Sequence, residues 1–281
     1  MPTIKLIADS GSTKTEWCLL RGQTKTVFFS QGLSPYFLDA TQIELIIRQE
    51  VLSHIKKAAV DHLYFYGTGC GQSDNVRMVK KALKRVFPSA AVHIESDMNG
   101  AARALCGHEK GIACILGTGS SSCYFNGKRI VKNNPGLGYI LGDEGSGAYL
   151  GKKVIQYFLY NTFDEDLRSR FDARFVTNTS EILNAVYKRP LANRYLASFA
   201  IFLAENRGHY MVENIIEDGF NDFFYKHVYK FRESWKYPIH FTGSVAFGFR
   251  DVLADLCNSY QLQLGKVLRN PMEGLVTYHS A

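Results

Sequence analysis

The chain has 281 residues, of which 46% are hydrophobic and 21% charged, a composition typical of a globular protein with a substantial core. Its net charge of +7 admits a nucleic-acid partner, but the densest basic run, Lys80–Arg85, has the pattern of a solvated amphipathic helix face. No stretch approaches the roughly 18 apolar residues that span a bilayer, and the first residues enter a strand without a signal-peptide pattern. We therefore expect a cytoplasmic protein of one large or two ordinary domains, with no nucleic-acid and no membrane partner.

The cysteines show neither a CxxC motif nor the Cys/His spacing of a zinc site. They are Cys18, Cys70, Cys106, Cys114, Cys123 and Cys257. In a chain of this length we expect reduced thiols, mainly in core positions, as in a cytoplasmic protein.

The first predicted strand, Thr3–Ala8, ends in the segment Asp9-Ser10-Gly11-Ser12-Thr13-Lys14-Thr15, and two further strands are predicted at Glu16–Leu20 and Thr26–Phe29. A turn rich in Gly, Ser and Thr presents backbone N–H and hydroxyl donors at the tip of a hairpin. Such a tip can cradle a phosphate without a helix. The Walker motif GxxxxGK[ST] is absent, and an ordinary hairpin turn remains the alternative.

Strands, glycine-rich loops and helices alternate over the next part of the chain. We expect a loop at Gly32–Phe37, a helix at Thr41–Ala59, a strand at His62–Tyr66, a loop at Gly67–Gly71, a helix at Asn75–Phe87, a strand at Ala91–Glu95 and a helix at Met98–Cys106. The first helix is expected to start with a capping box of Thr41 and Glu44. Asp97 precedes the last helix, and its local sequence fits either an N-cap or a catalytic base at the C-terminal edge of a sheet.

The pattern restarts near Gly107–Gly111, where we place the boundary between a domain of residues 1–107 and a domain of residues 108–281. A strand at Ile112–Leu116 enters a second donor-rich turn, Gly117–Ser122, and Cys123–Phe125 leaves it toward Asn126-Gly127, a type I′ hairpin signal. This order repeats the start of the chain at a distance of about 105 residues. Two similar halves are expected to face each other, with nucleotide phosphates between the two tips.

Six glycines and an adjacent pair of acids, Asp143 and Glu144, lie within residues 134–151. Glycine at this density indicates positive φ angles or close approach of the backbone to a ligand. Carboxylates only accept hydrogen bonds, so the acids suit a hydroxyl-rich ligand. The segment runs into a helical pattern, Lys152–Tyr160, so the glycines are expected in a loop at a helix N-terminus, where free N–H groups favour an anion. A surface loop with solvated acids is the alternative.

The remaining chain is predicted to be mostly helical. We expect helices at Ser180–Tyr187 (capped by Ser180), Asn193–Glu205, His209–Phe231 and Phe249–Tyr260, a strand at Pro238–Thr242 that enters Gly243–Ala246, and a closing helix at Pro271–Tyr278. An aromatic stripe of Phe220, Phe223, Phe224 and Phe231 has helical spacing, which is typical of core packing. The last helix, about residues 271–279, is free to pack back on the first domain.

Five elements follow one another: a hairpin at Asp9–Thr15, Asp97 at a helix start, a hairpin at Gly117–Ser122, a loop at Gly136–Gly147 and a turn at Gly243-Ser244. This order resembles the actin-like ATPase and sugar kinase superfamily. Within it, Gly142-Asp143-Glu144-Gly145-Ser146 after Gly136-Leu137-Gly138 is similar to the N-acetylglucosamine kinase branch of the BadF/BadG-type ATPase family. Further matches are Asp9–Thr15, Gly32-Leu33-Ser34, Gly117-Thr118-Gly119-Ser120 and Gly243-Ser244-Val245.

The resemblance implies an α/β fold of two ribonuclease-H-like domains with a cleft between them, and an ATP-dependent kinase that phosphorylates an amino sugar. Asp97 would be the general base for the hydroxyl at carbon 6, and Asp9 would hold Mg²⁺ through water. The residues expected to bind ATP and its phosphates are Gly11, Ser12, Thr13, Lys14, Thr118, Gly119, Gly243 and Ser244. Those expected to bind sugar are Ser34, Tyr36, Ser120, Ser121, Gly136, Leu137, Gly138 and Asp143. A homodimer is also compatible with the family.

The sequence departs from the family's pattern at three positions of the expected sugar pocket. Pro35 and Tyr36 stand where an asparagine is expected, Ser121 replaces another asparagine, and Leu137 replaces a tryptophan. The phosphate turns keep their pattern, so ATP use is more firmly implied than the identity of the sugar. N-acetylglucosamine is the first expectation, and N-acetylmuramate or another hexosamine is an alternative.

Two other functions fit the same fold. An ATPase activator of a 2-hydroxyacyl-CoA dehydratase-like enzyme would need an iron–sulfur cluster on Cys106, Cys114 or Cys123, whose contexts resemble strand and helix interiors. A non-catalytic sugar-sensing protein would usually carry a DNA-binding segment before the first strand, which here starts at about residue 3. A catalytically dead relative is disfavoured by Asp9, Asp97 and Asp143.

Overall fold

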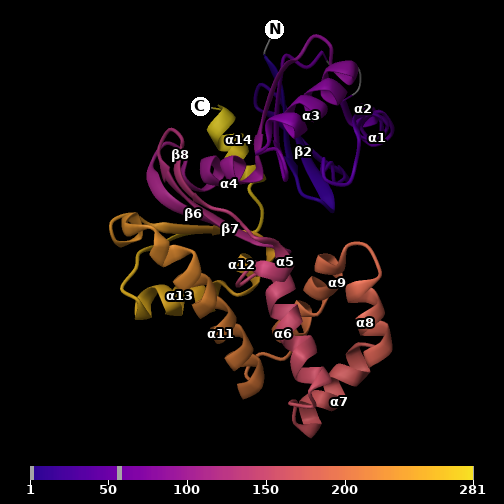
Figure 1. The fold of residues 1–281 in the computed structure, drawn as a ribbon. Coiled ribbons are helices and arrows are strands. Elements are labelled where there is room, and N and C mark those ends of the chain that lie inside the picture. The colour runs from indigo at the N-terminus through magenta and orange to yellow at the C-terminus, as the bar shows by residue number, and fades with distance from the viewer. Residues whose placement is uncertain (1–2, 56–58, 281) are drawn as a thin grey trace. The chain divides into compact units, whose positions relative to one another are not determined.

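The computed structural model describes residues 3–55 and 59–280 (Figure 1). Its contacts divide the chain into two compact units. The first consists of Met1–His108 together with Asn270–Ala281, and the second of Glu109–Arg269. Within the described residues, no helix is both long and apolar enough to cross a membrane.

The first unit is built on a five-stranded sheet with the order β3-β2-β1-β4-β5. The strands are β1 (Ile4–Ser10), β2 (Lys14–Arg21), β3 (Thr24–Gln31), β4 (His62–Gly67) and β5 (Ala91–Ser96). The strands β1, β2 and β3 are antiparallel neighbours, whereas β4 and β5 continue from β1 in parallel. The register pairs Ser10 with Gly67 and Gly67 with Ser96, so the carboxyl ends of three parallel strands meet at one edge of the sheet.

Helices cover both faces of this sheet. One core contains Leu6 and Trp17 and is covered by α1 (Ala40–Ile46), a π-helical segment (Ile47–Val51), α2 (Leu52–Ile55) and α3 (Ser73–Val86). On the other face, Ile7 packs with side chains of α4 (Asp97–Cys106) and α14 (Met272–Ser280). The two helices lie side by side, and α14 comes from the far end of the chain (Figure 1). The alternation of side chains along β1 is what divides the core in two.

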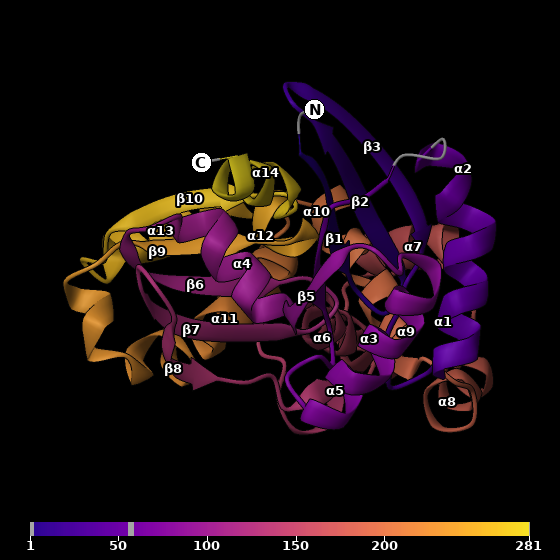
Figure 2. The same cartoon turned by 90° about the horizontal axis from the view of Figure 1, so that it is seen from above.

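The second unit repeats the same sheet. Its strands are β6 (Lys110–Leu116), β7 (Ser120–Asn126), β8 (Ile130–Asn134), β9 (Ile239–Thr242) and β10 (Leu264–Leu268), in the order β10-β9-β6-β7-β8 (Figure 2). The strand β6 pairs antiparallel with β7 and parallel with β9, as β1 does with β2 and β4. This equivalence confirms the predicted α/β fold class.

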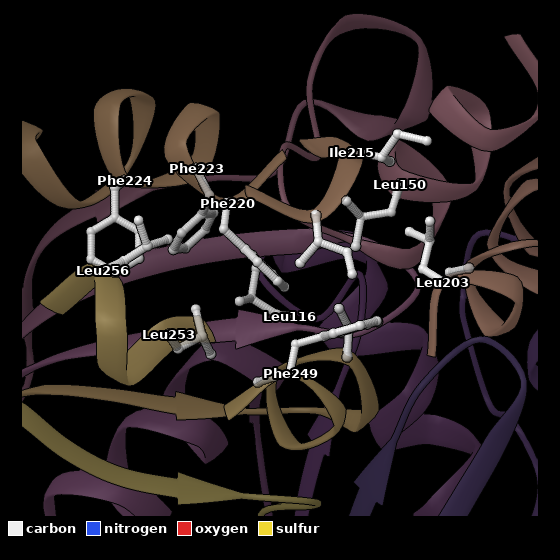
Figure 3. Packing of buried hydrophobic residues seen from close by; sticks show 14 of the residues in the cluster. Leu116, Leu150, Leu203, Ile215, Phe220, Phe223, Phe224, Phe249, Leu253 and Leu256 are labelled. Atoms are coloured by element: carbon white, nitrogen blue, oxygen red, sulfur yellow. The ribbon is translucent and has the colours of Figure 1, made fainter. Parts of the chain in front are cut away.

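The helices of the second unit enclose a large aromatic core (Figure 3). They are α5 (Gly138–Leu141), α6 (Gly147–Leu159), α7 (Glu165–Arg174), α8 (Thr179–Tyr187), α9 (Ala192–Ser198), α10 (Ala200–Glu205), α11 (Tyr210–Lys226), α12 (Ser244–Gly248) and α13 (Arg250–Ser259), with 3₁₀ turns at Val228–Lys230 and Arg232–Trp235. The predicted aromatic stripe is confirmed as core, because all four phenylalanines are buried.

Two predicted helix caps are wrong. The first helix begins at Ala40 with Asp39 as its N-cap, because the Asp39 side chain accepts from the Thr41 and Gln42 N–H groups while the Gln42 side chain accepts from the Asp39 N–H. Glu44 instead pairs with arginines on the surface. The described helix ends at Ile55, and positions 56–58 of the predicted helix lie outside the described residues. The helix α8 is capped by Asn178 rather than Ser180.

Two predicted helices are interrupted. The segment at 193–205 divides at Phe199 into α9 and α10, and the segment at 209–231 ends at Lys226. The 3₁₀ turns after Lys226 bend the chain so that Val228 and Phe231 remain in the core. The hairpin at Asn126-Gly127 is not type I′, because only Gly127 has a positive φ, whereas type I′ requires it at both central residues.

Candidate active site

The carboxyl ends of β1, β4 and β5 bring three side chains of the first unit together. Asp9 lies on β1, Thr68 directly follows β4, and Asp97 is the first residue of α4. The Thr68 hydroxyl donates to Asp97 Oδ2 at 2.8 Å, and the Met98 N–H donates to Asp97 Oδ1 at 2.9 Å. The N-cap of α4 is Ser96, whose hydroxyl accepts from the Asn99 N–H at 3.3 Å. The interpretation of Asp97 as an N-cap is therefore wrong.

The two aspartates are half-buried, and the Asp97 carboxylate is close enough to affect the ionisation of Asp9. Burial, followed by the Asp97 and Glu16 carboxylates, raises the pKa of Asp9 to about 7, against a smaller lowering by Lys14. Burial also raises the pKa of Asp97, while the donors from Thr68 and Met98 oppose the shift. Perturbed carboxylates at a sheet edge are typical of functional sites.

The hairpin tip of the first unit is a tight turn between β1 and β2. The Gly11 N–H donates to the Lys14 carbonyl, and the Gly32 N–H donates to the Thr13 carbonyl, each at 3.0 Å. A Cβ at Gly32 would lie 2.5 Å from the Gly11 carbonyl oxygen, so only glycine can approach the hairpin tip this closely. The Lys14 ammonium lies 5.1 Å from the Phe29 ring centroid at the exposed edge of the hairpin. Ser12 and Thr13 complete the predicted tip.

The loop after β3 places Ser34 and Tyr36 in the same unit. Ser34 is 1% exposed, and no residue in the described ranges provides a hydrogen-bond partner for its hydroxyl. Tyr36 is exposed, with its ring against Gly69, where a Cβ would lie 2.9 Å from the ring. Gly69 follows Thr68 directly, so the loop of Tyr36 adjoins the loop whose Thr68 hydroxyl donates to Asp97.

In the second unit, the turn after β6 is bonded to the start of α6. The Gly147 N–H donates to the Gly117 carbonyl at 2.8 Å, and the Ala148 N–H donates to the Thr118 carbonyl at 3.1 Å. The Tyr149 N–H donates to the Ser146 hydroxyl. The expectation of free N–H groups for an anion at this helix N-terminus is therefore wrong, because the turn and the cap already use them.

Asp143 occupies a cradle formed by two glycines. Its Oδ1 accepts from the Ser120 N–H at 3.4 Å, and a Cβ at Gly119 or Gly136 would lie 2.9 or 2.8 Å from its carboxylate oxygens. Burial raises the pKa of Asp143, with N–H groups of Ser120 and Gly138 opposing the shift. Three of the other predicted sugar-binding positions, Ser120, Gly136 and Gly138, thus converge on this carboxylate.

The neighbouring acid is used differently. Glu144 is buried, and its Oε1 lies 3.0 Å from the Lys226 ammonium, while its Oε2 lies 3.4 Å from His227 Nε2. The bond from Lys226 contributes to lowering the pKa of Glu144 against the effect of burial. Of the two acids expected to serve a hydroxyl-rich ligand, Glu144 has its charge paired within the protein, whereas Asp143 is held by backbone N–H groups.

The other predicted sugar positions differ in exposure. Leu137 is exposed, and Gly138 has a φ of +78° at the start of α5. Ser120 and Ser121 are consecutive on β7, so their side chains point to opposite faces of the sheet. The Ser120 hydroxyl is buried and has no hydrogen-bond partner in the part of the chain that the structure describes.

The turn after β9 lies directly against the turn after β6. Gly243 has a φ of +122°, and a Cβ there would lie 2.2 Å from the Leu116 carbonyl oxygen. The Gly243 N–H donates to the Leu268 carbonyl at 3.1 Å. Ser244 is exposed and begins α12. The two turns of the second unit that are predicted to bind ATP, after β6 and after β9, are therefore neighbours.

Sequence reasoning did not single out Thr68 or the partners of Glu144. The signal for Thr68 was its place between two glycines directly after a buried strand. No local signal linked Glu144 to Lys226 and His227, because they are separated by about 80 residues and meet only through the fold.

Two units with the same order of five strands, each with a Gly/Ser/Thr turn after its first strand, define the actin-like ATPase class of folds. The model of the BadF/BadG/BcrA/BcrD ATPase family matches residues 8–250, and the chain belongs to this family. A search of curated proteins finds no match.

Solved structures share this fold. A candidate N-acetylglucosamine kinase from Porphyromonas gingivalis superposes with a TM-score of 0.94 at 42% identity, covering 98% of each chain. A candidate N-acetylglucosamine kinase from Chromobacterium violaceum has a TM-score of 0.66 at 16% identity, with 99% of each chain covered. A ROK family glucokinase from Streptomyces griseus, in complex with glucose and AMPPNP, has a TM-score of 0.53 at 14% identity, covering 99% of this chain and 98% of its own. The latter two show the fold alone.

Proposed function

We propose that this protein is an ATP-dependent kinase that phosphorylates an N-acetylated hexosamine, with N-acetylglucosamine and its 6-hydroxyl group as the first candidate. The observation that carries the proposal is the group of Asp9, Thr68 and Asp97 at the strand ends. It occurs in a member of an ATPase family with 42% identity to a candidate N-acetylglucosamine kinase.

Asp97 is the proposed general base. Its partners, a hydroxyl and a backbone N–H, are neutral donors that fix the orientation of the carboxylate without cancelling its charge. The raised pKa strengthens it as a base. In the reaction, the sugar hydroxyl oxygen bonds to the γ-phosphorus, the bond to the β–γ bridging oxygen breaks, and the hydroxyl proton passes to Asp97. The products are ADP and the sugar phosphate.

Asp9 is the proposed residue for Mg²⁺. A half-buried carboxylate beside two other carboxylates, with a pKa raised to about 7, is a position that a divalent cation stabilises. Residues 3–55 and 59–280 contain no group of three or more His, Cys, Asp or Glu side chains arranged to hold a metal by themselves. One protein carboxylate supplemented by water and phosphate oxygens is the ligand set that Mg²⁺ commonly takes. When bound, the ion would offset the negative charge of the phosphates.

The Gly/Ser/Thr turns are the proposed phosphate ligands. Thr13 is exposed at the first tip and Thr118 is half-buried at the second, so each can contribute a hydroxyl donor. Donors on short turns suit phosphoryl transfer, in which the protein mainly positions groups and stabilises charge. Gly243 and Ser244 are proposed to contact the adenosine. Lys14 is a weaker candidate, because its ammonium packs over Phe29.

The sugar is proposed to bind Asp143 and the loops around Ser34 and Ser120. Asp143 is an acceptor-only group in a glycine cradle, which suits ring hydroxyls. The Ser34 and Ser120 hydroxyls are buried and have no hydrogen-bond partner among the residues that the structure describes. Buried hydroxyls are normally paired, so a polar ligand offers a physical reason for both.

The alternative of a dehydratase activator receives no support from the cysteines. All six thiols are buried, and they are divided between the two units. A cluster shared by two copies of the chain would need cysteines at an accessible surface.

The test is ADP release from Mg-ATP with a panel of acceptors: N-acetylglucosamine, N-acetylmuramate, N-acetylmannosamine, glucosamine, glucose and no sugar. Production of ADP that depends on sugar would support the kinase, and the ranking of the acceptors would identify the preferred sugar. Equal release with every acceptor and without sugar would reject the hexosamine kinase.

A further inference from the structure

Asp143 has a backbone conformation that a non-glycine residue rarely adopts. Its φ is +58°, in the left-handed region, and the residue is 8% exposed. Steric clashes with the side chain raise the free energy of this backbone conformation, so contacts in the surrounding structure must compensate for that cost.

The next residue, Glu144, is anchored at the end of α11. Its Oε1 is 3.0 Å from Lys226 Nζ, and its Oε2 is 3.4 Å from His227 Nε2. Lys226 is the last residue of α11, and His227 is 4% exposed with its ring stacked on Phe223 at 4.7 Å. Glu144 therefore joins the loop before α6 to the C-terminal end of α11, where Lys226 is exposed and His227 is buried.

His227 continues the connection to β7. Its Nδ1 lies 3.3 Å from the Ser122 hydroxyl oxygen. Because a carboxylate only accepts hydrogen bonds, Nε2 carries the proton toward Glu144, and Nδ1 accepts from the Ser122 hydroxyl. Burial lowers the pKa of His227, in agreement with a neutral imidazole.

The two acids are thus tied to one strand at neighbouring positions. Asp143 accepts from the Ser120 N–H, and Glu144 reaches the Ser122 hydroxyl through His227. Ser120 and Ser122 are two residues apart on β7, so their side chains share a face. Anchors on both consecutive acids restrict the peptide between them.

We propose that Glu144 and His227 are positioning residues. Their bonds hold the Asp143 backbone in the left-handed conformation, which keeps its carboxylate in the cradle of Gly119 and Gly136. This inference rests on the proposed function, because the carboxylate that they position is the one proposed to bind sugar hydroxyls. A misplacement of a binding group by about 1 Å is enough to weaken a site strongly.

The test is to measure binding of N-acetylglucosamine and of Mg-ATP to the full-length protein by calorimetry. Glu144→Gln keeps the shape of the side chain and removes its charge, and His227→Phe keeps the ring on Phe223 and removes both hydrogen bonds. Each is expected to raise the sugar Kd about tenfold and leave the Mg-ATP Kd unchanged. The matched control is Tyr149→Phe, which removes a hydrogen bond to Asp222 between α6 and α11 and should change neither Kd.

A double-mutant cycle separates positioning from a general loss of structure. In the Asp143→Ala background, Glu144→Gln should cause no further rise in the sugar Kd, because its effect passes through Asp143. Equal effects in both backgrounds, or no effect of Glu144→Gln alone, would overturn the inference. If Asp143→Ala itself leaves the sugar Kd unchanged, the proposed sugar site fails, and the inference fails with it.

A second variant keeps the test informative if Glu144→Gln does not fold. Lys226→Met leaves Glu144 and His227 in place and removes only the exposed cation of the network. It should raise the sugar Kd by a smaller factor, about threefold, with Mg-ATP binding unchanged. A folded Lys226→Met protein with a wild-type sugar Kd would also count against the proposal that Glu144 and His227 position Asp143.

Discussion

Asp97 owes its orientation to Thr68, a residue on another loop. Both of its carboxylate oxygens accept hydrogen bonds, one from the Thr68 hydroxyl and one from the Met98 N–H. An amide at this position can keep the packing but cannot take a proton from a hydroxyl group. The proposed role as a general base can therefore be separated from a structural role.

We expect Asp97→Asn to lower kcat by about 10²–10⁴-fold, the usual contribution of a general base, with ATP and sugar binding retained. Steady-state ADP release and calorimetry measure the two effects. Asp74→Asn is the matched control, because Asp74 also lies in the first turn of a helix of the first unit and is exposed. A wild-type kcat in Asp97→Asn would leave Asp97 with no catalytic role.

Asp9 connects the site to the pH dependence of stability. Its pKa is raised from 3.8 to about 7, so the folded protein holds this proton more tightly than the unfolded chain does. The proton on Asp9 therefore contributes fully to the free energy of unfolding below about pH 4, and this contribution is lost as the pH rises to about 7. Without Mg²⁺, ionised Asp9 therefore destabilises the protein at neutral pH.

We expect Asp9→Asn to be more stable than wild type in EDTA at pH 8, by on the order of 1–4 kcal/mol, and to lose most of this advantage at pH 5. Thermal unfolding of both proteins at the two pH values measures the difference. An advantage of the same size at pH 5 and pH 8 would show that the pKa of Asp9 is not raised.

At the scale of elements, the glycines within residues 134–151 serve different purposes. Gly136 makes room for Asp143, whereas Gly147 and Gly151 lie inside α6 and allow it to approach α9. A Cβ at Gly151 would lie 1.9 Å from the Leu196 carbonyl oxygen. The sequence pattern predicted one loop for all of them, because helix packing and ligand approach both favour glycine.

We expect Gly151→Ala to destabilise the protein by about 1–3 kcal/mol through overpacking, even though alanine is the better helix former by about 1 kcal/mol. Gly248→Ala is the control, because a Cβ there meets nothing within 4 Å. The melting temperatures of the two variants measure the contrast. A Gly151→Ala protein as stable as Gly248→Ala would contradict the close packing of α6 on α9.

Strong periodic patterns predicted the existence of most elements, and weak ones were missed. The strand β8 is largely exposed, and β10 contains Gly265 and Lys266 within five residues, so neither shows a strand pattern. The helix α7 buries only Leu167 and Phe171. These elements depend on their neighbours in the fold, because their own residues carry few local preferences.

At the scale of the molecule, the last helix belongs to the first unit. The helix α14 packs on α4, where Gly274 approaches the Ala104 backbone, and it covers Ile7, Cys18 and Leu20 of the sheet. The chain therefore leaves the first unit after residue 108 and returns to it at residue 270. The stability of β1 then depends on residues at the opposite end of the sequence.

We expect Leu275→Ala to destabilise the first unit by about 2–5 kcal/mol, the usual cost of truncating a fully buried leucine. Amide hydrogen exchange in β1 and β4 should become faster, although Leu275 is far from both in sequence. Leu183→Ala, at a position that is 45% exposed, is the control and should leave this exchange unchanged. Unchanged exchange in β1 after Leu275→Ala would contradict the contribution of α14.

The sequence by itself determined the fold class, the family and the turns that resemble phosphate ligands, because hydrophobic periodicity and short glycine motifs are local. Only the tertiary structure decided which side chains act together. The bond from Thr68 to Asp97, the pairing of Glu144 with Lys226 and His227, and the use of the α6 N–H groups by the turn after β6 all join distant segments. Such contacts follow from strand order and helix packing, which no local pattern records.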